Sequence, residues 1–154
     1  MRAIVQRVQR ASVRVGESDE RRIGSGLVVL VAVAETDDPA DADYIAEKVG
    51  NLRIMDFDGR MDLSVVDVSG DVMLIPQFTL YANTRKGRRP SFSASAKPDK
   101  ARPLLERLES NLTEIGLRIV AGEFGTHMVV DLANDGPVTI ILDSDDRHRS
   151  RKAS

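Results

Sequence analysis

The sequence predicts an α+β domain in which a mixed β-sheet is covered by two helices. Apolar runs with strand character stand before, between and after two segments of helical periodicity, which fits neither a regular βαβ alternation nor an all-β chain. The length of 154 residues suits one domain, and a hydrophobic content of 42% is enough for a single core. We expect one domain over residues 1–143, followed by a polar, disordered tail over residues 144–154.

The first part of the chain has the alternation of polar and apolar residues that is typical of strands. Residues 3–8 alternate loosely, and residues 12–15 and 21–23 flank Gly16-Glu17, which predicts a hairpin. Residues 27–34 form a continuous apolar run, so we expect a strand that is buried on both faces.

Two helices are predicted from their end signals and their apolar spacing. Asp37-Asp38-Pro39 provides an N-cap and a proline in the first turn, and apolar residues then recur at spacings of three and four up to Leu52. The second helix is expected over about residues 98–115, with Pro103 in its first turn and Gly116 at its end.

The remaining segments are predicted from apolar runs and turn residues. Residues 53–63 are expected to be a loop with a turn at Asp58-Gly59. Residues 72–80 predict a strand in which Pro76 marks an edge, a bulge or the strand end, because proline has no N–H to donate. Residues 81–96 lack periodicity and predict a long loop, a kind of segment that is often functional. Three closing strands are expected over residues 117–121, 127–133 and 138–142, with a tight turn at Asn134-Asp135-Gly136-Pro137.

Composition and missing motifs exclude several classes of catalytic site. The chain has no cysteine, which excludes a thiolate nucleophile, a disulfide and a Cys-based metal site. It has two histidines, His127 and His148, and the sequence contains no G-x-S-x-G elbow, P-loop or H-E-x-x-H zinc motif. We therefore expect no cofactor and no metal, and any catalysis would depend on positioning and on backbone N–H donors.

The chain carries no sign of a membrane or export signal. Gln6 and Arg7 interrupt the apolar run at the N-terminus, and residues 27–34, the longest apolar stretch, are too few to cross a bilayer. We expect a cytoplasmic protein with no membrane partner. The net charge of −2 means that any RNA contact requires a local basic patch.

Three segments could carry function. Pro76-Gln77-Phe78-Thr79 ends an apolar strand, where backbone N–H groups could form an oxyanion hole, or where Thr79 simply caps a turn. Arg85-Lys86-Gly87-Arg88-Arg89 puts four cations on the predicted loop, as a phosphate-binding patch or as a solvated charge run. The segment Asn134-Asp135-Gly136-Pro137-Val138-Thr139, taken alone, favours a turn with a trans Gly136–Pro137 bond.

Blocks of sequence along nearly the whole chain are similar to one family. They are Met1-Arg2-Ala3-Ile4-Val5-Gln6-Arg7-Val8, Lys48-Val49-Gly50-Asn51-Leu52-Arg53-Ile54, Gln77-Phe78-Thr79-Leu80-Tyr81-Ala82, Lys86-Gly87-Arg88-Arg89-Pro90-Ser91-Phe92, Gly122-Glu123-Phe124-Gly125 and Asn134-Asp135-Gly136-Pro137-Val138-Thr139. Together they resemble the D-aminoacyl-tRNA deacylase family, also called D-tyrosyl-tRNA deacylase. The resemblance implies a mixed, barrel-like β-sheet covered by two main helices.

The resemblance also implies hydrolysis of the ester bond of D-aminoacyl-tRNA by a homodimer. The active site would lie between residues 77–79 of one chain and Gly136-Pro137 of its partner. In the family this Gly–Pro bond is cis, and its carbonyl oxygens would hold the substrate ammonium so that an L side chain clashes with backbone. Glycine has no side chain to clash, so Gly-tRNA is an expected second substrate.

Individual residues take roles from the same resemblance. Backbone N–H groups around Gln77 and Phe78 would stabilise the oxyanion, and the 2′-hydroxyl of the terminal adenosine would help to activate water. Thr79 would position the substrate rather than attack it, because no base is evident to activate its hydroxyl. Phe124 and Met128 match positions near the pocket and are equally well explained as core. A required 2′-hydroxyl confines the activity to RNA, so we expect aminoacyl-tRNA and no DNA as partner.

Pro76 departs from the family pattern, and three other functions stay open. D-specific members usually carry Ser at this position, whereas a chirality-relaxed paralogue carries Pro. The chain could therefore be an aminoacyl-tRNA editing hydrolase with relaxed chirality, although Asn134-Asp135 is the D-specific form. It could also be a structural dimer with no substrate, or a non-catalytic tRNA-binding module that uses the basic residues Arg85, Lys86, Arg88 and Arg89.

Overall fold

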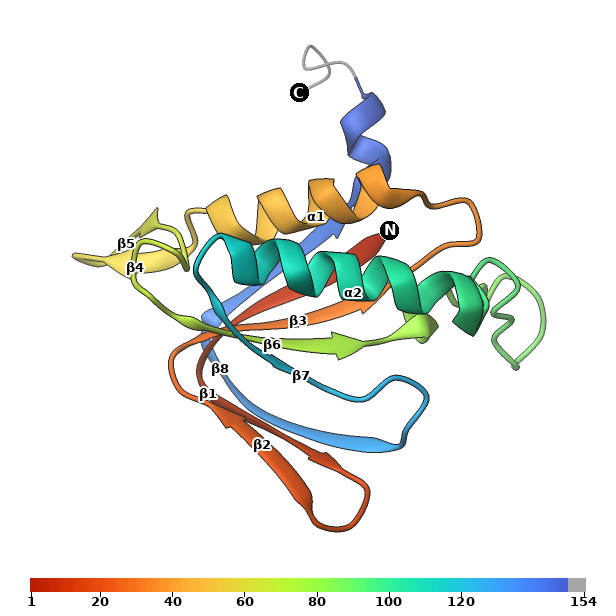
Figure 1. Cartoon of the computed structure of the whole chain (residues 1–154), viewed down its shortest axis with the longest axis horizontal. Coiled ribbons are helices and arrows are strands. Elements are labelled where there is room, and N and C mark those ends of the chain that lie inside the picture. Colours follow the sequence, from red (N-terminus) through yellow and green to blue (C-terminus); the bar gives the residue numbers. More distant parts are fainter. Residues whose placement is uncertain (150–154) are drawn as a thin grey trace.

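The computed structural model describes residues 1–149 and shows two helices packed across one face of a curved β-sheet (Figure 1). The strands are β1 (Arg2–Val15), β2 (Asp19–Ile23), β3 (Gly26–Ala32), β4 (Met55–Phe57), β5 (Arg60–Leu63), β6 (Asp71–Pro76), β7 (Arg118–Ala121) and β8 (Met128–Asp143). The α-helices are α1 (Pro39–Asn51) and α2 (Pro98–Glu114), and η1 (Phe78–Tyr81) and η2 (Ser144–His148) are 3-10 helices.

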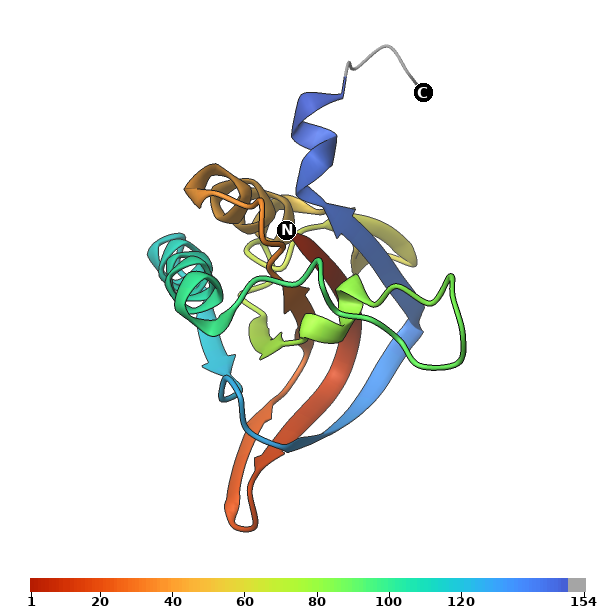
Figure 2. The ribbon, with the colours of Figure 1, turned by 90° about the vertical axis from the view of Figure 1, so that its right-hand side faces the viewer.

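The main sheet is mixed, as the sequence predicts. Its strand order is β2-β1-β3-β6-β7, and β8 also pairs with β1. The three pairs made by β1 are antiparallel, whereas β3–β6 and β6–β7 are parallel. Because β1 is 14 residues long, its first half pairs with β3 and its second half with β2, while β8 runs along most of its length. Seen end-on, the sheet curls towards a barrel (Figure 2).

The main core lies between the two helices and the sheet. Ile45 and Val49 of α1, Leu108 and Leu112 of α2 and Val29 of β3 have no exposed surface. On each helix the two residues are four apart, so one apolar face meets the sheet. Each such side chain contributes about 1.5–3 kcal/mol by leaving water. A second, smaller apolar cluster fills the inside of the curled sheet.

The helix ends follow the signals in the sequence, with one difference. The Asp38 carboxylate accepts hydrogen bonds from the N–H groups of Ala40 and Asp41, and the Asp41 carboxylate accepts one from the Asp38 N–H. This reciprocal cap confirms the predicted start of α1. Pro103 lies inside α2 beyond its first turn, rather than in the first turn as predicted.

The predicted turn at residues 134–137 is wrong, because β8 is one continuous strand. Asn134 pairs with Val8 of β1, and Thr139 pairs with Gln6. An advance of two residues along β1 therefore lies opposite an advance of five residues along β8. The Asn, Asp, Gly and Pro residues occupy this irregularity in the strand pairing. Turn-forming residues suit such a bulge as well as they suit a hairpin, so the sequence alone does not separate the two.

Residues 53–63 are not a loop but contain the β4–β5 hairpin. The predicted turn within it is confirmed, since Asp58 and Gly59 have φ angles of 52° and 75°. Two successive residues in the left-handed region give the type of turn that closes two-residue hairpins. The flanking strands are only three and four residues long and mostly exposed, which explains the missing apolar alternation.

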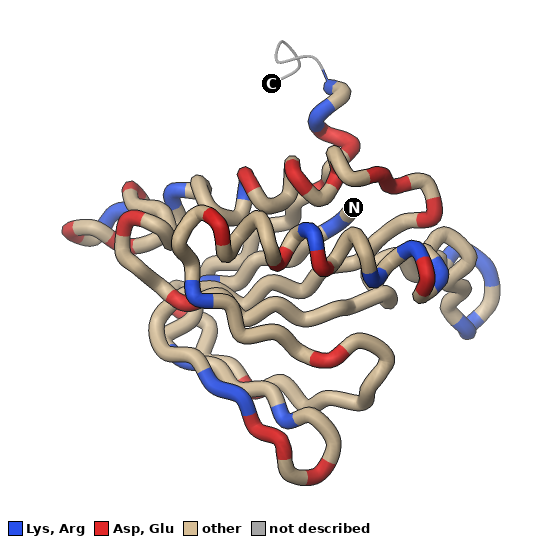
Figure 3. Tube along the Cα trace, in the orientation of Figure 1, with Lys and Arg blue, Asp and Glu red and all other residues tan. Residues whose placement is uncertain are grey.

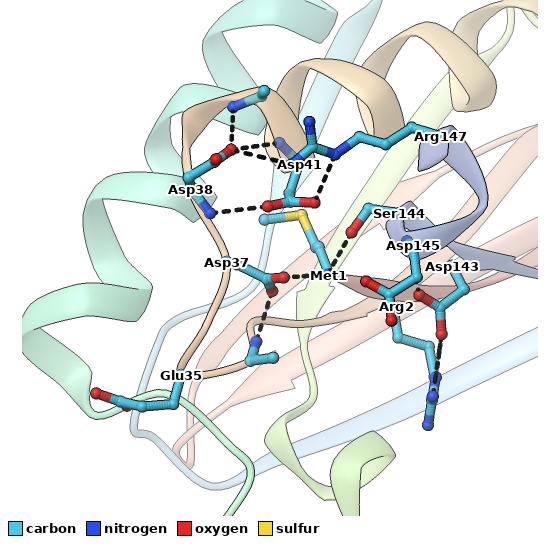
Figure 4. Close-up of polar contacts among 12 residues, drawn as sticks. Met1, Arg2, Glu35, Asp37, Asp38, Asp41, Asp143, Ser144, Asp145 and Arg147 are labelled. Atoms are coloured by element: carbon cyan, nitrogen blue, oxygen red, sulfur yellow. Dashed lines mark hydrogen bonds and ion pairs between the residues drawn. The ribbon is translucent and has the colours of Figure 1, made fainter. Parts of the chain in front are cut away.

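The first part of the predicted disordered tail is ordered, as η2 (Figure 4). Ser144 has no exposed surface, and its hydroxyl accepts a 2.5 Å hydrogen bond from the Met1 ammonium, which also pairs with Asp37 at 2.6 Å. Arg147 donates to the Asp41 carboxylate at the start of α1 over 3.1 Å. These contacts hold η2 against the helix layer, and residues 150–154 of the predicted tail lie outside the described residues. No described helix has both the length and the apolar character needed to cross a membrane.

Candidate active site

The end of β6 positions the segment that the sequence marks as catalytic. Pro76 is the last residue of β6 and pairs with Val31 of β3, which confirms it as the strand end. The next residue, Gln77, donates its N–H to the Val31 carbonyl over 2.7 Å. The chain then leaves the sheet and turns into η1, so the residues after Gln77 project from the end of a rigid strand.

Two backbone N–H groups at the start of η1 are free. Among residues 1–149, neither the Phe78 nor the Thr79 N–H donates a hydrogen bond to a protein acceptor, whereas the N–H groups of Leu80 and Ala82 bond to Gln77 and Thr79 carbonyls. The Gln77 N–H donates to the Val31 carbonyl. It is therefore not a free donor, although the resemblance places it among the donors of the oxyanion hole. Two successive free N–H groups can bind a negatively charged oxygen.

The side chains of this segment contain no nucleophile that is paired with a base in the described chain. The Gln77 amide nitrogen donates to the Thr79 hydroxyl, and within the described chain no His, Asp or Glu side chain hydrogen-bonds to that hydroxyl. A threonine without a base is a poor nucleophile. The positioning role expected for Thr79 stays a prediction.

Two adjoining pockets lie beside this segment. One is lined by Pro76, Gln77 and Phe78 together with Val31, Ala96 and Phe124 among others; its neighbour shares Pro76 and Phe124 and adds Arg102 and Gly122. Phe124 thus faces the candidate site. Met128 lines neither pocket, and its sulfur accepts a hydrogen bond from the Glu123 N–H at 3.3 Å.

Arg102 is a pocket residue that the sequence did not indicate. Its guanidinium lies 4.8 Å from the centroid of the Phe124 ring, a cation–π contact. Arg102 stands on the polar side of α2, where arginine is common and carries no special signal.

The far end of η1 is anchored by Arg2. The Arg2 guanidinium stacks 4.8 Å from the Tyr81 ring centroid, donates to the Leu80 carbonyl over 3.2 Å and pairs with Asp143 over 3.0 Å. Burial raises the pKa of the Tyr81 hydroxyl, and the carboxylates of Asp37 and Asp143 raise it further. Tyr81 is therefore a neutral anchor rather than an acid or base near pH 7.

The Gly136-Pro137 motif is exposed on β8 and is held from below. The Gly136–Pro137 bond is cis, which corrects the trans expectation and agrees with the resemblance. Arg7, only 8% exposed, donates to the carbonyl of Asp135 over 3.2 Å and to the carbonyl of Ile54 over 2.8 Å. The Asn134 amide donates to the carbonyls on either side, of Arg7 and Val138, both over 3.0 Å.

Gly136 cannot be replaced without strain. Its φ is +121°, and a Cβ there would lie 2.8 Å from a Val138 methyl and 3.1 Å from an Arg7 nitrogen. Arg7 lies on the inward face of β1 together with Ala3 and Val5. A charged residue at a buried position of an alternating strand is the sequence signal that could have identified Arg7 as a residue that supports the motif.

One chain does not bring the two motifs together. Gln77 follows β6, and Gly136-Pro137 lies on β8, with β3 and β1 between them. Three interstrand spacings amount to ~14 Å along the sheet. Neither residue of the Gly-Pro motif lines the pockets beside residues 76–78.

The predicted basic residues form a separate exposed patch. Arg85, Lys86, Arg88 and Arg89 are all exposed, and none of them forms an ion pair within residues 1–149. The loop that carries them, closed by a bridge between Asn83 and Ser91, follows η1 directly. Figure 3 shows this loop in blue at one end of the molecule, while the two helices carry both acidic and basic residues. An anionic ligand would therefore be attracted to the loop more strongly than to the helix layer.

Comparison with known proteins covers almost the whole chain. The family model described as D-Tyr-tRNA(Tyr) deacylase matches residues 4–143. A protein named D-aminoacyl-tRNA deacylase from Heliobacterium modesticaldum is 51% identical over 144 residues, 93% of this chain and 96% of the relative. One of the same name from Thermus aquaticus is 47% identical over 152 residues, 98% of this chain and all of the relative.

Two solved structures are also similar. One, named c-Myc DNA Unwinding Element Binding Protein, is 34% identical, covers 93% of this chain and 98% of its own, and superposes with a TM-score of 0.85. Another, described as a probable eukaryotic D-amino acid tRNA deacylase, has the same fold, with a TM-score of 0.76 at 19% identity over 92% of this chain and 97% of its own. The match over nearly its full length shows that this chain belongs to the D-Tyr-tRNA(Tyr) deacylase family.

Proposed function

We propose that this chain hydrolyses the ester bond between a D-amino acid and tRNA, and that a second copy of the chain supplies a Gly136-Pro137 filter against L-amino acids. The observation that carries the proposal is the pair of free N–H groups at Phe78 and Thr79, beside a pocket at the end of β6. The names of relatives that are about half identical to this chain support the class of reaction.

The chemistry needs few side chains. Water attacks the ester carbonyl, the carbonyl oxygen becomes an oxyanion, and the Phe78 and Thr79 N–H groups stabilise that charge. The tRNA 2′-hydroxyl helps to take the proton from water, and the 3′-oxygen leaves with a proton to give free amino acid and tRNA. Gln77 holds Thr79 in place through their hydrogen bond. Removing one such donor from an oxyanion hole costs about 10²–10³ in rate, so two donors account for a useful part of the acceleration.

The need for a second copy follows from the separation of the motifs. Gly136-Pro137 is exposed and lies three strands away from Gln77 in the same chain. A large apolar side chain is exposed near each motif, with Ile141 of β8 70% exposed and Phe78 56% exposed. A second copy would bury these side chains while it brings its own Gly136-Pro137 motif to the pocket, since the two surfaces of a two-fold dimer are the same patch.

The selectivity rests on a backbone that cannot move away. Arg7 holds the carbonyl of Asp135 and Asn134 holds that of Val138, on either side of Gly136-Pro137. The Gly136 and Pro137 carbonyls between them would therefore meet the substrate ammonium in a fixed position. An L side chain would then collide with backbone, whereas a D side chain would point to solvent and glycine would pass. Pro76, which removes an N–H next to the pocket, would relax this selectivity if it acts as in the relaxed paralogue.

The exposed basic patch would hold the tRNA. Its four cations have no protein partner within the described chain, which leaves them available to phosphate. One solved relative is named for binding DNA, so binding of DNA, or of tRNA without turnover, is the second function to be tested.

The test is deacylation of D-Tyr-tRNA, L-Tyr-tRNA and Gly-tRNA, followed as loss of the ester, with the oligomeric state measured by sedimentation. We expect rapid loss of the D and Gly esters, survival of the L ester and a dimer. Replacing Gly136-Pro137 with Ala-Ala should abolish discrimination or activity, whereas Asp131→Ala, an exposed change on the same strand, should not.

Other outcomes identify the competing functions. Loss of all three esters would keep the hydrolase and point to Pro76 as a relaxing residue, which Pro76→Ser should reverse. No loss of any ester, with tRNA or a DNA duplex still bound, would replace the enzyme by a nucleic-acid-binding module. An active monomer would reject the partner's role in the filter.

A further inference from the structure

Residues 94–96, which connect the basic loop to α2, are hydrogen-bonded to the residues that follow β3. The Ala96 N–H donates to the Val33 carbonyl over 2.8 Å, and the Glu35 N–H donates to the Ala94 carbonyl over 3.1 Å. Ser95, between these two contacts, is bridged to Ala34. These contacts fix the backbone of Ser95 and so the position of its side chain, although the residues before it belong to an exposed loop.

Ser95 contacts the candidate oxyanion hole through its hydroxyl. The Ser95 hydroxyl donates to the Phe78 carbonyl over 2.9 Å. A peptide group is planar, so the carbonyl of Phe78 and the N–H of Thr79 lie in one plane and point in opposite directions. A hydrogen bond that holds the carbonyl therefore also fixes the direction of the Thr79 N–H, one of the two free donors.

Phe92 holds the same residue through its side chain. The rings of Phe78 and Phe92 pack edge to face, with centroids 5.1 Å apart and planes at 74°. Such contacts are worth about 0.5–1.5 kcal/mol beyond burial. Because the Phe78 side chain is 56% exposed, Phe92 removes much of the freedom that an exposed ring would have.

We propose that Ser95 and Phe92 are positioning residues, which aim the Phe78–Thr79 peptide at the substrate carbonyl; this inference rests on the proposed function. Phe92 follows the basic residues by only a few positions, so the loop that would bind the tRNA also holds the Phe78–Thr79 peptide group. The contacts of Ser95 and Phe92 with Phe78 would thereby couple tRNA binding to the alignment of the oxyanion hole.

Ser95→Ala tests the proposal in the full-length protein. We expect kcat for D-Tyr-tRNA to fall about tenfold, a small part of the loss seen when an oxyanion donor is removed, with little change in KM. Ser95→Thr keeps the hydroxyl and should retain most of the activity. Ser93→Ala is the matched control, because Ser93 lies two residues away and its hydroxyl has only a 3.5 Å contact with Ser91.

Phe92→Ala should lower kcat as well, and the double variant Phe92→Ala/Ser95→Ala should lose less than the product of the two single losses, because both contacts act on Phe78. Binding of uncharged tRNA to Ser95→Ala should match wild type. A wild-type kcat in Ser95→Ala, or a loss confined to KM, would overturn the positioning role.

Amide NMR separates this inference from the proposed function. Ser95→Ala should shift the Thr79 amide resonance and speed its hydrogen exchange, while Ser93→Ala should leave both unchanged. If wild type shows no deacylation but the Thr79 amide responds, the proposed function fails and the structural link holds. If wild type is active and the Thr79 amide does not respond, the link fails alone.

Discussion

The helix layer and residues 76–97 differ in how their polar groups are satisfied. On the helices, Arg107 pairs with both carboxylate oxygens of Asp43 over 2.7 and 2.9 Å, and Asn111 donates to the same carboxylate. Residues 76–97 instead combine two free N–H groups with the exposed cations of residues 85–89, which form no ion pair within the described chain. The first region uses its polar groups to hold the fold, and the second leaves them open to a ligand, so substitutions should separate stability from activity.

The largest effect is expected in the helix layer, from Leu108→Ala. Leu108 has no exposed surface and packs in the main core. Its truncation should lower the free energy of unfolding by about 2–5 kcal/mol, because apolar burial is reduced and a cavity is left. Urea denaturation followed by circular dichroism measures this, with the exposed Thr113→Ala as control. The kcat of the folded variant should equal that of wild type; a large fall in kcat would mean that the helices take part in the site.

The double variant Arg88→Ala/Arg89→Ala should give the opposite result. Both residues are exposed, so the free energy of unfolding should change by less than about 0.5 kcal/mol. The KM for aminoacyl-tRNA should rise, and the slope of log affinity against log salt should fall by about 0.7–0.9 for each tRNA phosphate that the variant no longer neutralises.

The charge-matched control for this variant is Arg53→Ala/Arg60→Ala, near the β4–β5 hairpin at the other end of the molecule (Figure 1). It removes the same charge and should leave KM and the salt slope nearly unchanged. Equal effects of the two double variants would mean that overall charge, rather than the loop, attracts the tRNA.

Local signals predicted the fold where a local contact decides it. Asp38 and Pro39 start α1 because a side-chain cap acts within three residues, and Pro76 ends β6 because it lacks one N–H. The bulge at Asn134 depends on its pairing with β1, more than 120 residues away in sequence, as its bond to the Arg7 carbonyl shows. Residue pattern within a window carries no information on such a partner.

The sequence predicted the candidate site, like the fold, only where local signals decide it. Residues 76–79 follow an apolar run that predicts a strand, and the blocks that resemble the family include residues 77–79. That the Gln77 N–H is occupied follows only from the pairing of β6 with β3. Ser95 is one of several serines in a polar loop, and nothing in its neighbourhood distinguishes it before the loop is folded against η1.

A smaller effect is expected at the junction of η2 and α1, from Arg147→Ala. Burial tends to raise the pKa of the Asp41 carboxyl, but the Asp38 N–H, the Ser144 hydroxyl and the nearby Met1 ammonium and Arg147 outweigh it, so the pKa lies below its ordinary value. A carboxyl with a lowered pKa stabilises the fold above its ordinary pKa of about 3.9, and this stabilisation is lost as the pH falls through the folded-state value.

Arg147→Ala should therefore cost about 1 kcal/mol at pH 7, because it removes one charged hydrogen bond to a largely buried carboxylate. The difference from wild type should start to shrink below about pH 4, where Asp41 becomes protonated in the unfolded chain, and should go on shrinking as the pH falls through the lower pKa of the folded state. Urea unfolding at pH 7, 5 and 3 measures the window, and a cost that stays constant down to pH 3 would show that packing rather than charge holds η2.

The smallest effect is expected from Arg107→Ala, although this residue makes the shortest paired contacts on the helices. Both partners are about half exposed, with 48% and 45% of the side-chain surface of Arg107 and Asp43 open to water. The Arg107 hydrogen bond lowers the pKa of Asp43, but water screens exposed pairs and ordering two side chains opposes the attraction. The melting temperature should stay within experimental scatter of wild type at 0.15 M salt and fall slightly at low salt, where screening is weaker. A drop as large as that of Arg147→Ala would mean that the Asp43–Asn111 contact, rather than the exposed ion pair, depends on Arg107 to hold the two helices together.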